Sequence, residues 1–319
     1  MSITPNILVT GGAGFIGSNL ADELIRRGAK VKIIDNLITG FRENLEEIEG
    51  DFEFVEGDIA DSEVIGQASK GIDFVFHEAA LPSVPRSVAN PLETHNACVN
   101  GTFNVLNAAR DAGVKRVIYA ASSSAYGDQE VLPKVETMAP EPLSPYAAAK
   151  LTGEYYCRVF TQVYGLATYS LRYFNVFGPR QNPSSQYSGV ISRFIDSFMK
   201  GGSPVIYGDG KQSRDFTYIA NVIDANIRAL EATKGSGQVM NVANGERVSL
   251  LELVDVMKSV TGKTDVTVDF QPERAGDVKH SQADNTRSKE WLGYTKLVGL
   301  EDGIKNTIDW WKESRFAKE

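Results

Sequence analysis

The sequence is poor in metal-binding side chains, with two cysteines and three histidines among 319 residues. None of them stand at the spacings of a metal site, so no metal is expected. Cys98 and Cys157 both fall in segments with a helical pattern. We interpret them as buried thiols rather than a disulfide, and we expect the protein to be cytoplasmic.

Positive charge is also scarce, because 33 Lys and Arg face 41 Asp and Glu, for a net charge of −8. An acidic chain without charged blocks is a poor candidate for binding nucleic acid or an anionic membrane. No apolar run approaches the roughly 20 residues of a membrane helix. The start at Met1 does not resemble a signal peptide. Any phosphate site must therefore be built locally.

The chain does contain short β-branched runs that alternate with helical patterns, and 42% of its residues are hydrophobic, enough for a substantial core. Short apolar runs separated by helices indicate buried parallel strands. The predicted fold class is therefore α/β, a Rossmann doubly wound parallel sheet. Strands are predicted at Asn6–Thr10, 32–35, Phe52–Glu56, Phe74–His77, 116–120 and 167–172, and helices are predicted to begin at Ile16, Val64, Asn96 and Tyr146.

The pattern changes past Gly178, where a polar loop and a glycine-rich stretch interrupt the alternation. It returns after Asp215 and gives way to a smaller αβ region from Ser249. We therefore predict a discontinuous organisation. Residues 1–178 plus about 214–243 form the Rossmann domain, and about 179–213 plus 244–319 form a smaller αβ C-terminal domain that binds the substrate.

A glycine turn, Gly11-x-x-Gly14-x-x-Gly17, follows the first predicted strand and opens a helix. Glycines let the backbone approach a pyrophosphate, and the helix N-terminus offers free N–H groups, so the turn predicts a dinucleotide site. Asp35 lies 18 positions beyond Gly17, at the end of the second strand. Its carboxylate can bind ribose hydroxyls and would repel a 2′-phosphate, which favours NAD over NADP. Asp58, at the next strand end, is expected near the adenine.

Tyr146 and Lys150 lie four residues apart and therefore share one face of a predicted helix. A free tyrosine has a pKa of about 10 and is a poor base at neutral pH. The Lys150 ammonium and the positive nicotinamide should favour phenolate and lower that pKa. Ser122, Ser123 and Ser124 follow a predicted strand, at the kind of strand end where α/β sheets bind ligands.

These motifs together resemble the extended short-chain dehydrogenase/reductase family over nearly the whole chain. The nucleotide-sugar 4-epimerases are the most similar branch. Residues 83–87 and 276–281 look like the bacterial UDP-N-acetylglucosamine and UDP-glucose 4-epimerases. The other supporting segments are residues 10–17, 77–80, 100–102, 122–127, 173–178 and 213–216.

The resemblance implies an enzyme that inverts C4 of a UDP-hexose through a transient 4-keto sugar while NAD stays bound. Ser122 falls where the family keeps its catalytic Ser/Thr and would pass the O4 proton to Tyr146, with Ser123 orienting the sugar. Lys150 would hold a nicotinamide ribose hydroxyl. The implied cofactor-binding residues are Gly11, Gly14, Phe15, Ile16, Gly17, Asp35, Asn36, Leu37, Gly40, Asp58, Ile59, Ala79, Ala80, Asn100, Ala121, Tyr146, Lys150 and Tyr173.

A diphosphate needs fixed donors in an acidic protein, and Arg214 and Arg274 lie in glycine-containing segments typical of binding loops. By resemblance Asn175 contacts a phosphate or the sugar, and Asp277 binds the uridine ribose. Ser281 stands where epimerases restricted to plain sugars have a bulky tyrosine, so it leaves room for a 2-N-acetyl group. The full substrate-binding set is Ser83, Arg86, Ser122, Ser123, Ser124, Tyr146, Asn175, Val190, Tyr207, Arg214, Arg274, Asp277 and Ser281.

Alternatives stay open. Related dehydratases use an Asp-Glu pair where this chain has Ser123 and Ser124, which argues against elimination. A UDP-glucuronate 4-epimerase or decarboxylase is the nearest rival, with Arg86 facing the carboxylate. A non-catalytic NAD sensor is a rival of another class, although such proteins lose the Tyr or the Lys. The choice between UDP and dTDP is also open.

Relatives form homodimers through a bundle of four helices, two from each subunit. Residues 94–112 and 146–163 match those helices. Their apolar positions serve either that interface or the core: Val99, Phe103, Leu106, Leu151 and Tyr155.

Overall fold

The computed structural model describes residues 4–183, 189–273 and 278–318. Its centre is a seven-stranded sheet with the strand order β11-β6-β5-β4-β1-β2-β3, and all neighbouring strands run parallel. This confirms the doubly wound fold. The strands are β1 (Asn6–Thr10), β2 (Lys30–Asp35), β3 (Phe52–Glu56), β4 (Phe74–His77), β5 (Arg116–Ser122), β6 (Ala167–Tyr173) and β11 (Gln238–Val242).

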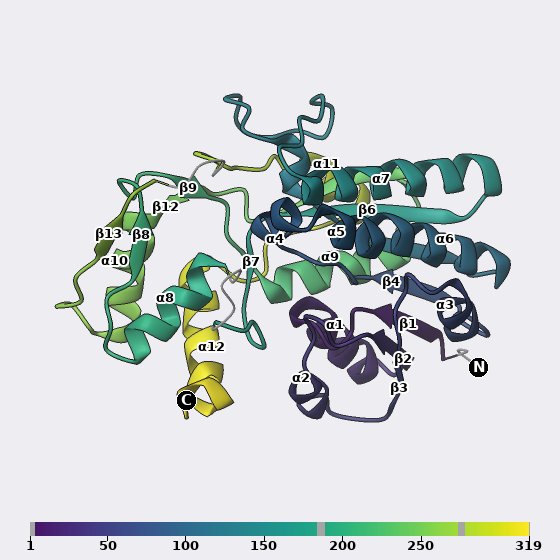
Figure 1. Cartoon of the computed structure of the whole chain (residues 1–319), viewed down its shortest axis with the longest axis horizontal. Helices are drawn as coiled ribbons and strands as arrows, with labels where there is room; N and C mark the ends of the chain where they lie inside the picture. Colours follow the sequence, from purple (N-terminus) through teal and green to yellow (C-terminus); the bar gives the residue numbers. More distant parts are fainter. Residues whose placement is uncertain (1–3, 184–188, 274–277, 319) are drawn as a thin grey trace.

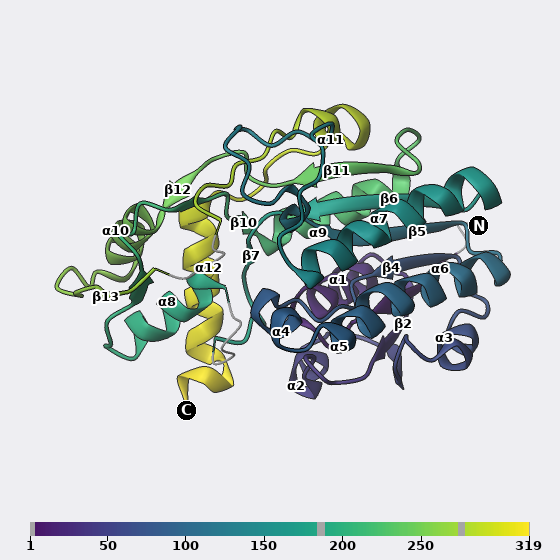
Figure 2. The ribbon, with the colours of Figure 1, turned by 45° about the horizontal axis from the view of Figure 1, so that its top comes forward.

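Helices cover both faces of the sheet because alternate strand residues point to opposite sides. On one face Ile7 and Val9 pack with apolar residues of α1 (Phe15–Arg26) and α9 (Ile219–Glu231). On the other face, Leu8 joins a cluster with α3 (Ser62–Ala68), α6 (Gly101–Asp111) and α7 (Pro145–Tyr164). Figures 1 and 2 show these layers.

A second lobe lies beside the carboxyl ends of β6 and β11 (Figure 2). It contains α8 (Val190–Met199), α10 (Leu250–Thr261) and α12 (Leu300–Glu313), with the short pairs β8–β13 and β9–β12. The remaining elements are α2 (Arg42–Glu46), α4 (Val84–Ala89), α5 (Pro91–His95), β7 (Val176–Phe177), β8 (Val205–Tyr207), β9 (Ser213–Arg214), β10 (Thr217–Tyr218), β12 (Val248–Ser249), β13 (Asp269–Gln271) and α11 (Thr286–Leu292), plus the helical turns Asn96–Asn100, Ser123–Tyr126 and Arg315–Ala317.

All six predicted strands are present, with some ends displaced. β5 runs to Ser122 rather than ending at residue 120, because Ala121 and Ser122 still pair with Arg172 and Tyr173 of β6. The helix predicted from Asn96 begins earlier, at Pro91, and passes through a π-helical turn at Asn96–Asn100 before α6. The division into two domains stays a prediction. α11 packs against the edge of the main sheet, where Arg287 donates to the Val239 carbonyl at 3.0 Å.

The order of the strands positions the functional site. From β1 the chain moves outward to β2 and β3, then returns to β4 on the other side of β1. Ligands of doubly wound sheets bind where the strand order reverses, at the carboxyl ends. Here that point lies between Thr10 and His77, which are partners in the β1–β4 register. Within the described residues no helix has the length and apolarity to cross a membrane, and no metal-binding cluster is found.

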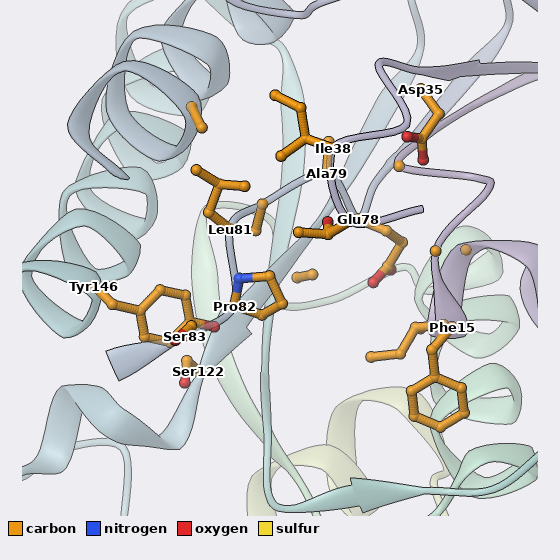
Figure 3. A pocket seen from close by; sticks show the side chains of 18 of the residues that line it. Phe15, Asp35, Ile38, Glu78, Ala79, Leu81, Pro82, Ser83, Ser122 and Tyr146 are labelled. Carbon is orange, nitrogen blue, oxygen red and sulfur yellow. The ribbon is translucent and has the colours of Figure 1, made fainter. Parts of the chain in front are cut away.

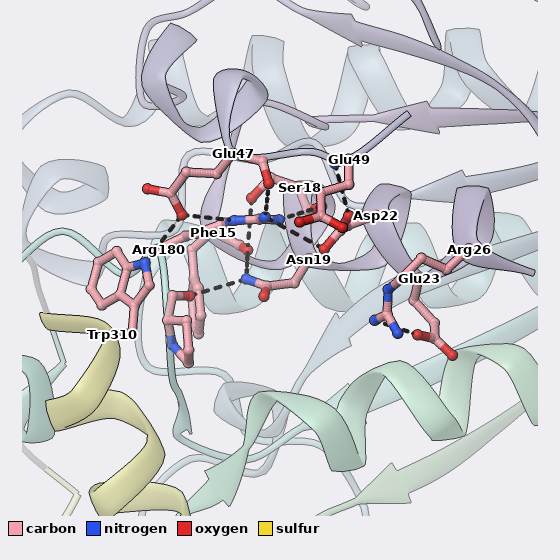
Figure 4. A network of polar contacts seen from close by, with 11 residues as sticks. Phe15, Ser18, Asn19, Asp22, Glu23, Arg26, Glu47, Glu49, Arg180 and Trp310 are labelled. Carbon is pink, nitrogen blue, oxygen red and sulfur yellow. Dashed lines mark hydrogen bonds and ion pairs between the residues drawn. The ribbon is translucent and has the colours of Figure 1, made fainter. Parts of the chain in front are cut away.

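Arg180 ties the second lobe's entry loop to the helix that follows the glycine turn (Figure 4). Its side chain is 7% exposed. The guanidinium donates to the carbonyls of Ser18 at 2.9 Å and Glu47 at 2.7 Å, and it pairs with the Glu47 and Asp22 carboxylates. Trp310 of α12 also donates to the Glu47 carboxylate, at 3.1 Å.

We predict that Arg180→Lys lowers the free energy of unfolding by about 1–3 kcal/mol, because an ammonium cannot reach both carbonyls and at least one is left unsatisfied. Denaturant unfolding of the purified variant measures the change. Arg26→Lys on α1 is the matched control, since Arg26 is 59% exposed in its pair with Glu23. An exposed pair contributes little. Equal stability of the two variants would contradict this role of Arg180.

Candidate active site

The turn between β1 and α1 brings two stretches of backbone into close contact at its glycines. Gly11 has a φ of +70°, and a Cβ there would lie 2.6 Å from the Ala79 Cα. A Cβ on Gly17 would lie 2.3 Å from the Gly11 carbonyl oxygen. Gly14 is the N-cap of α1 and offers no side-chain cap, so the first N–H groups of the helix are available to an anion.

Asp35 closes one end of the site, at the carboxyl end of β2. Its carboxylate accepts hydrogen bonds from the backbone N–H groups of Ala13 at 3.0 Å and Leu37 at 2.8 Å. Burial raises its pKa, and these bonds act in the opposite direction. A Cβ on Gly40 would lie 2.8 Å from Asp35 Oδ1, so that glycine is needed beside the carboxylate. A lone pair remains for a ribose hydroxyl.

Two further residues predicted at this end, Asn36 and Asp58, contact each other. Asn36 Nδ2 donates to Asp58 Oδ2 at 3.0 Å, which joins the ends of β2 and β3. Both residues line the same pocket as Asp35 and Ile59. This end of the site therefore presents two carboxylates and an amide to a ligand.

The other end of the site is built from α7 and the end of β5. Lys150 is 3% exposed and donates from Nζ to the Ala120 carbonyl at 2.7 Å. Tyr146, one turn earlier, lies close enough to Ser122 for the serine side chain to influence the pKa of the phenol. Ser122 Oγ also caps the following helical turn, because it accepts from the Ser124 N–H at 3.2 Å and the Ser124 hydroxyl at 2.8 Å.

Burial raises the pKa of Tyr146 above its ordinary value, and the side chain of Ser122 opposes that shift. Burial lowers the pKa of Lys150. The lowered tyrosine pKa expected from the sequence is therefore not a property of the chain's own groups. The cost of burying a phenolate exceeds what these protein groups return.

One cavity of about 670 Å³ contains both ends of the site. Figure 3 shows Tyr146 and Ser122 on one side of it and Asp35 on the other. The predicted residues that line it are Gly11, Gly14, Phe15, Ile16, Gly17, Asp35, Asn36, Asp58, Ile59, Ala79, Ala80, Ser83, Arg86, Ala121, Ser122, Tyr146, Lys150, Tyr173 and Asn175. The glycine turn, the acidic strand end and the Tyr–Lys helix thus face one space.

Other predicted residues lie outside this lining. Leu37 and Gly40 contact the Asp35 carboxylate without lining the cavity. Asn100 is exposed, and its Nδ2 donates to Asn96 Oδ1 at 3.0 Å. The rest of this group is Ser123, Ser124, Val190, Tyr207, Arg214 and Ser281. Arg274 and Asp277 lie outside the described residues. The roles of all of these residues stay predictions.

Arg214 and Ser281 do lie beside each other in the second lobe. The Ser281 N–H donates to the carbonyl of Ser213 at 3.0 Å, one residue before Arg214. The Arg214 guanidinium donates to the Lys279 carbonyl at 3.2 Å. Arg214 and Ser281, which the sequence predicts to bind the substrate, are 67 positions apart in the chain and yet lie close together in the fold.

Glu78 also lines the cavity, between the Asp35 end and the Tyr146 end, although the sequence predicted no role for it. Its Oε1 accepts from the Tyr173 hydroxyl at 2.9 Å. Burial raises its pKa to about 7. The preceding His77 is hydrogen-bonded through its two ring nitrogens to the hydroxyls of Thr10 at 2.8 Å and Thr102 at 2.9 Å. Burial lowers the pKa of His77 to about 3, so the ring is neutral and serves to hold these elements together.

Comparison with known families gives one match over most of the chain. Residues 7–243 match the model described as the NAD dependent epimerase/dehydratase family. The UDP-glucose 4-epimerase of Mycolicibacterium smegmatis is 39% identical over 96% of this chain and 98% of its own length. A UDP-N-acetyl-α-D-glucosaminuronate decarboxylase of Bacillus cytotoxicus is 34% identical over 96% of this chain and 97% of its own.

Solved structures with the same fold carry nucleotide sugars. The UDP-glucose 4-epimerase of Thermotoga maritima with UDP-glucose has a TM-score of 0.92 and 38% identity, covering 97% of this chain and 99% of that one. A UDP-N-acetylglucosamine 4-epimerase of Methanobrevibacter ruminantium with UDP-N-acetylmuramic acid has a TM-score of 0.92, 39% identity and the same coverage. The UDP-glucuronic acid 4-epimerase of Bacillus cereus with NAD and UDP-glucuronic acid has 0.89 and 32%, again with that coverage.

Proposed function

Because the chain belongs to the NAD dependent epimerase/dehydratase family, we propose that it inverts C4 of a UDP-hexose, with UDP-N-acetylglucosamine and UDP-glucose as the substrates it takes. The observation that carries this proposal is the shared cavity. The glycine turn and Asp35 face the same space as Ser122, Tyr146 and Lys150. A cofactor bound along the turn would extend toward Tyr146, whose hydroxyl group is placed to take a proton from the sugar.

The cavity fits an extended dinucleotide. The close approaches of Gly11 and Gly17 leave no room for a side chain where the pyrophosphate would approach. Asp35 has a lone pair for the adenosine ribose. The exposed helix N-terminus supplies donors for phosphate oxygens. NAD bound there supplies the oxidant and then the reductant for C4 of the sugar.

The chain's own groups handle the proton. Tyr146 takes it from the C4 hydroxyl, and Ser122 provides the hydrogen bond that relays it. Lys150 stabilises the phenolate electrostatically and is fixed by its bond to the Ala120 carbonyl. When the 4-keto sugar has turned within the pocket, Tyr146 returns the proton to O4. The cofactor ends as it began, so no net oxidation occurs.

The substrate's nucleotide would be held by two donors, Arg214 in the second lobe and Asn175 just after β6. Asn175 is fixed with its Nδ2 on the Asp215 carbonyl at 3.1 Å. Arg86 pairs with Glu93 and lines the cavity, so it is positioned to meet the sugar or a phosphate.

For sugar selection we predict that Ser281→Tyr lowers the ratio of kcat/KM for UDP-N-acetylglucosamine to that for UDP-glucose by about tenfold or more. The tyrosine ring would occupy the volume that the N-acetyl group needs. Steady-state assays on both sugars measure the ratio. Ser281→Ala is the matched control and should leave it unchanged. If the tyrosine variant also leaves the ratio unchanged, Ser281 does not select the sugar.

The decisive experiment is incubation of the purified protein with each UDP-sugar in turn, followed by separation of the products. The proposal expects C4 epimers from the N-acetyl and plain hexoses. Turnover of UDP-glucuronate alone, with or without loss of carbon dioxide, would favour the uronate rival that similarity to the decarboxylase supports. NAD binding without any turnover would favour a sensor.

We also propose that the protein works as a homodimer through α6 and α7. Phe103 and Tyr155 are 41% and 54% exposed, which is unusual for aromatic side chains on two packed helices. Leu106 and Leu151 are buried and belong to the core instead. Sedimentation equilibrium that shows only monomer at micromolar concentration would rule out the dimer.

A further inference from the structure

Glu78 is held rigidly at the point where the strand order reverses. It follows β4 directly, and its N–H donates to the Thr10 carbonyl at 3.2 Å. The next residue, Ala79, is the one that Gly11 approaches most closely, and its N–H donates to the Thr10 hydroxyl at 3.3 Å. The backbone of Glu78 therefore cannot move without disturbing the phosphate turn.

The carboxyl group of Glu78 is only half satisfied. Oε1 accepts from the Tyr173 hydroxyl, which in turn accepts from Asn226 Nδ2 at 2.8 Å. Oε2 is buried and has no hydrogen-bond partner in the described part of the chain. A buried carboxyl oxygen left in this way is costly unless a ligand supplies the missing interaction.

The charged surroundings of Glu78 are simple. Lys150 on α7 is the cation that acts on it, and Tyr146 on the same helix and Tyr173 on β6 line the same cavity. His77, its neighbour on β4, is neutral. Burial raises the pKa of Glu78 to about 7, so both of its protonation states are accessible near neutral pH.

A dinucleotide with its adenosine at Asp35 and its pyrophosphate at the glycine turn must place its other end toward Tyr146 and Lys150. Glu78 lies on that path, between Asp35 and Tyr146 (Figure 3). Oxidised nicotinamide carries a positive charge and reduced nicotinamide carries none. A carboxylate beside the ring therefore interacts differently with the two forms.

We propose that Glu78 sets the redox balance of the bound cofactor, its carboxylate favouring the oxidised form over the reduced one. Such a preference holds the resting cofactor as NAD⁺, the form that oxidises C4 of the sugar. The inference rests on the proposed NAD site and not on the identity of the sugar. Glu78 acts as a tuning group and takes no proton from the substrate.

The test compares dissociation constants for NAD⁺ and NADH, measured by calorimetry on the full-length protein freed of cofactor. Measurements at about pH 5.5 and about pH 8.5 bracket the Glu78 pKa of about 7. At the lower pH, Glu78 is protonated and must lose its proton to favour NAD⁺. At the higher pH it is already ionised. The ratio of the NADH constant to the NAD⁺ constant should therefore rise about tenfold with pH.

Glu78→Gln keeps the shape and an acceptor for Tyr173 but removes the charge, so its ratio should stay flat across this pH range. Any titration of Tyr146 or Lys150 persists in the variant, and the difference from wild type isolates Glu78. Glu78→Met serves as a second uncharged variant if the amide does not fold.

A wild-type ratio that is flat, or a rise that survives in both uncharged variants, would overturn the inference. Epimerase activity with a flat ratio would leave the proposed function standing and remove only this role of Glu78. Failure of the wild type to bind either cofactor form would instead overturn the NAD site, and this inference with it.

Discussion

Replacing Tyr146 with phenylalanine should lower kcat for C4 epimerisation by about 10²–10⁴-fold, the usual contribution of a positioned acid–base group. The ring and its packing are retained, so NAD affinity should change little. Without the phenol oxygen at residue 146, the C4 hydroxyl keeps its proton. Steady-state kinetics together with calorimetric titration of NAD⁺ separate the two effects.

Tyr155→Phe is the matched control, because it lies on the same helix and is 54% exposed. It should retain wild-type kcat. If Tyr146→Phe retains more than about a tenth of the activity, another group performs the proton transfer. Loss of the general base itself should lower kcat by at least about 10²-fold. Loss of NAD binding in that variant would mean that it is the shape of the site, and not its proton chemistry, that was damaged.

Gly17→Ala should weaken NAD binding by about 10²-fold, which matches the loss of two charge-assisted hydrogen bonds at about 1.5 kcal/mol each. The added Cβ would lie 2.3 Å from the Gly11 carbonyl oxygen, so the turn or the helix start must shift. Either shift moves the N–H groups that face the pyrophosphate. Calorimetric titration with NAD⁺ measures the loss.

Gly66→Ala in α3 is the control for adding a methyl group to a helical glycine. Nothing lies within 4 Å of the new Cβ, so that variant should bind NAD normally and gain about 0.4–1 kcal/mol of stability. Normal NAD affinity in Gly17→Ala would show that the close approach at the turn is not what forms the site.

The parts of the site that the sequence predicted are those with local signals. The glycine turn and Asp35 stand next to strands whose apolar runs are unmistakable, and Tyr146 and Lys150 are related by helical spacing. Doubly wound folds bring all of these to one edge of the sheet. Their meeting in one cavity therefore follows from strand order alone.

Features that depend on contacts between residues far apart in the chain could not be predicted from the sequence. Glu78 follows a strand as many exposed acids do, but its Oε1 accepts a hydrogen bond from Tyr173, which lies 95 residues later in the sequence. The end of β5 at Ser122 depends on pairing with β6. The shift in the pKa of Tyr146 comes from burial, which helical spacing does not report. Tertiary packing, rather than local propensity, decides each of these.

The most direct test of the central claim, C4 inversion with a retained cofactor, uses UDP-N-acetylglucosamine deuterated at C4 of the sugar. The purified protein is incubated with it in ordinary water, and the product is examined by NMR. The account predicts the C4 epimer with deuterium still at C4, since the same cofactor removes and returns it. Deuterium lost to solvent, or recovered in free NADH, would contradict a retained carrier. Unchanged UDP-sugar in this assay and with UDP-glucose would contradict the proposed epimerisation.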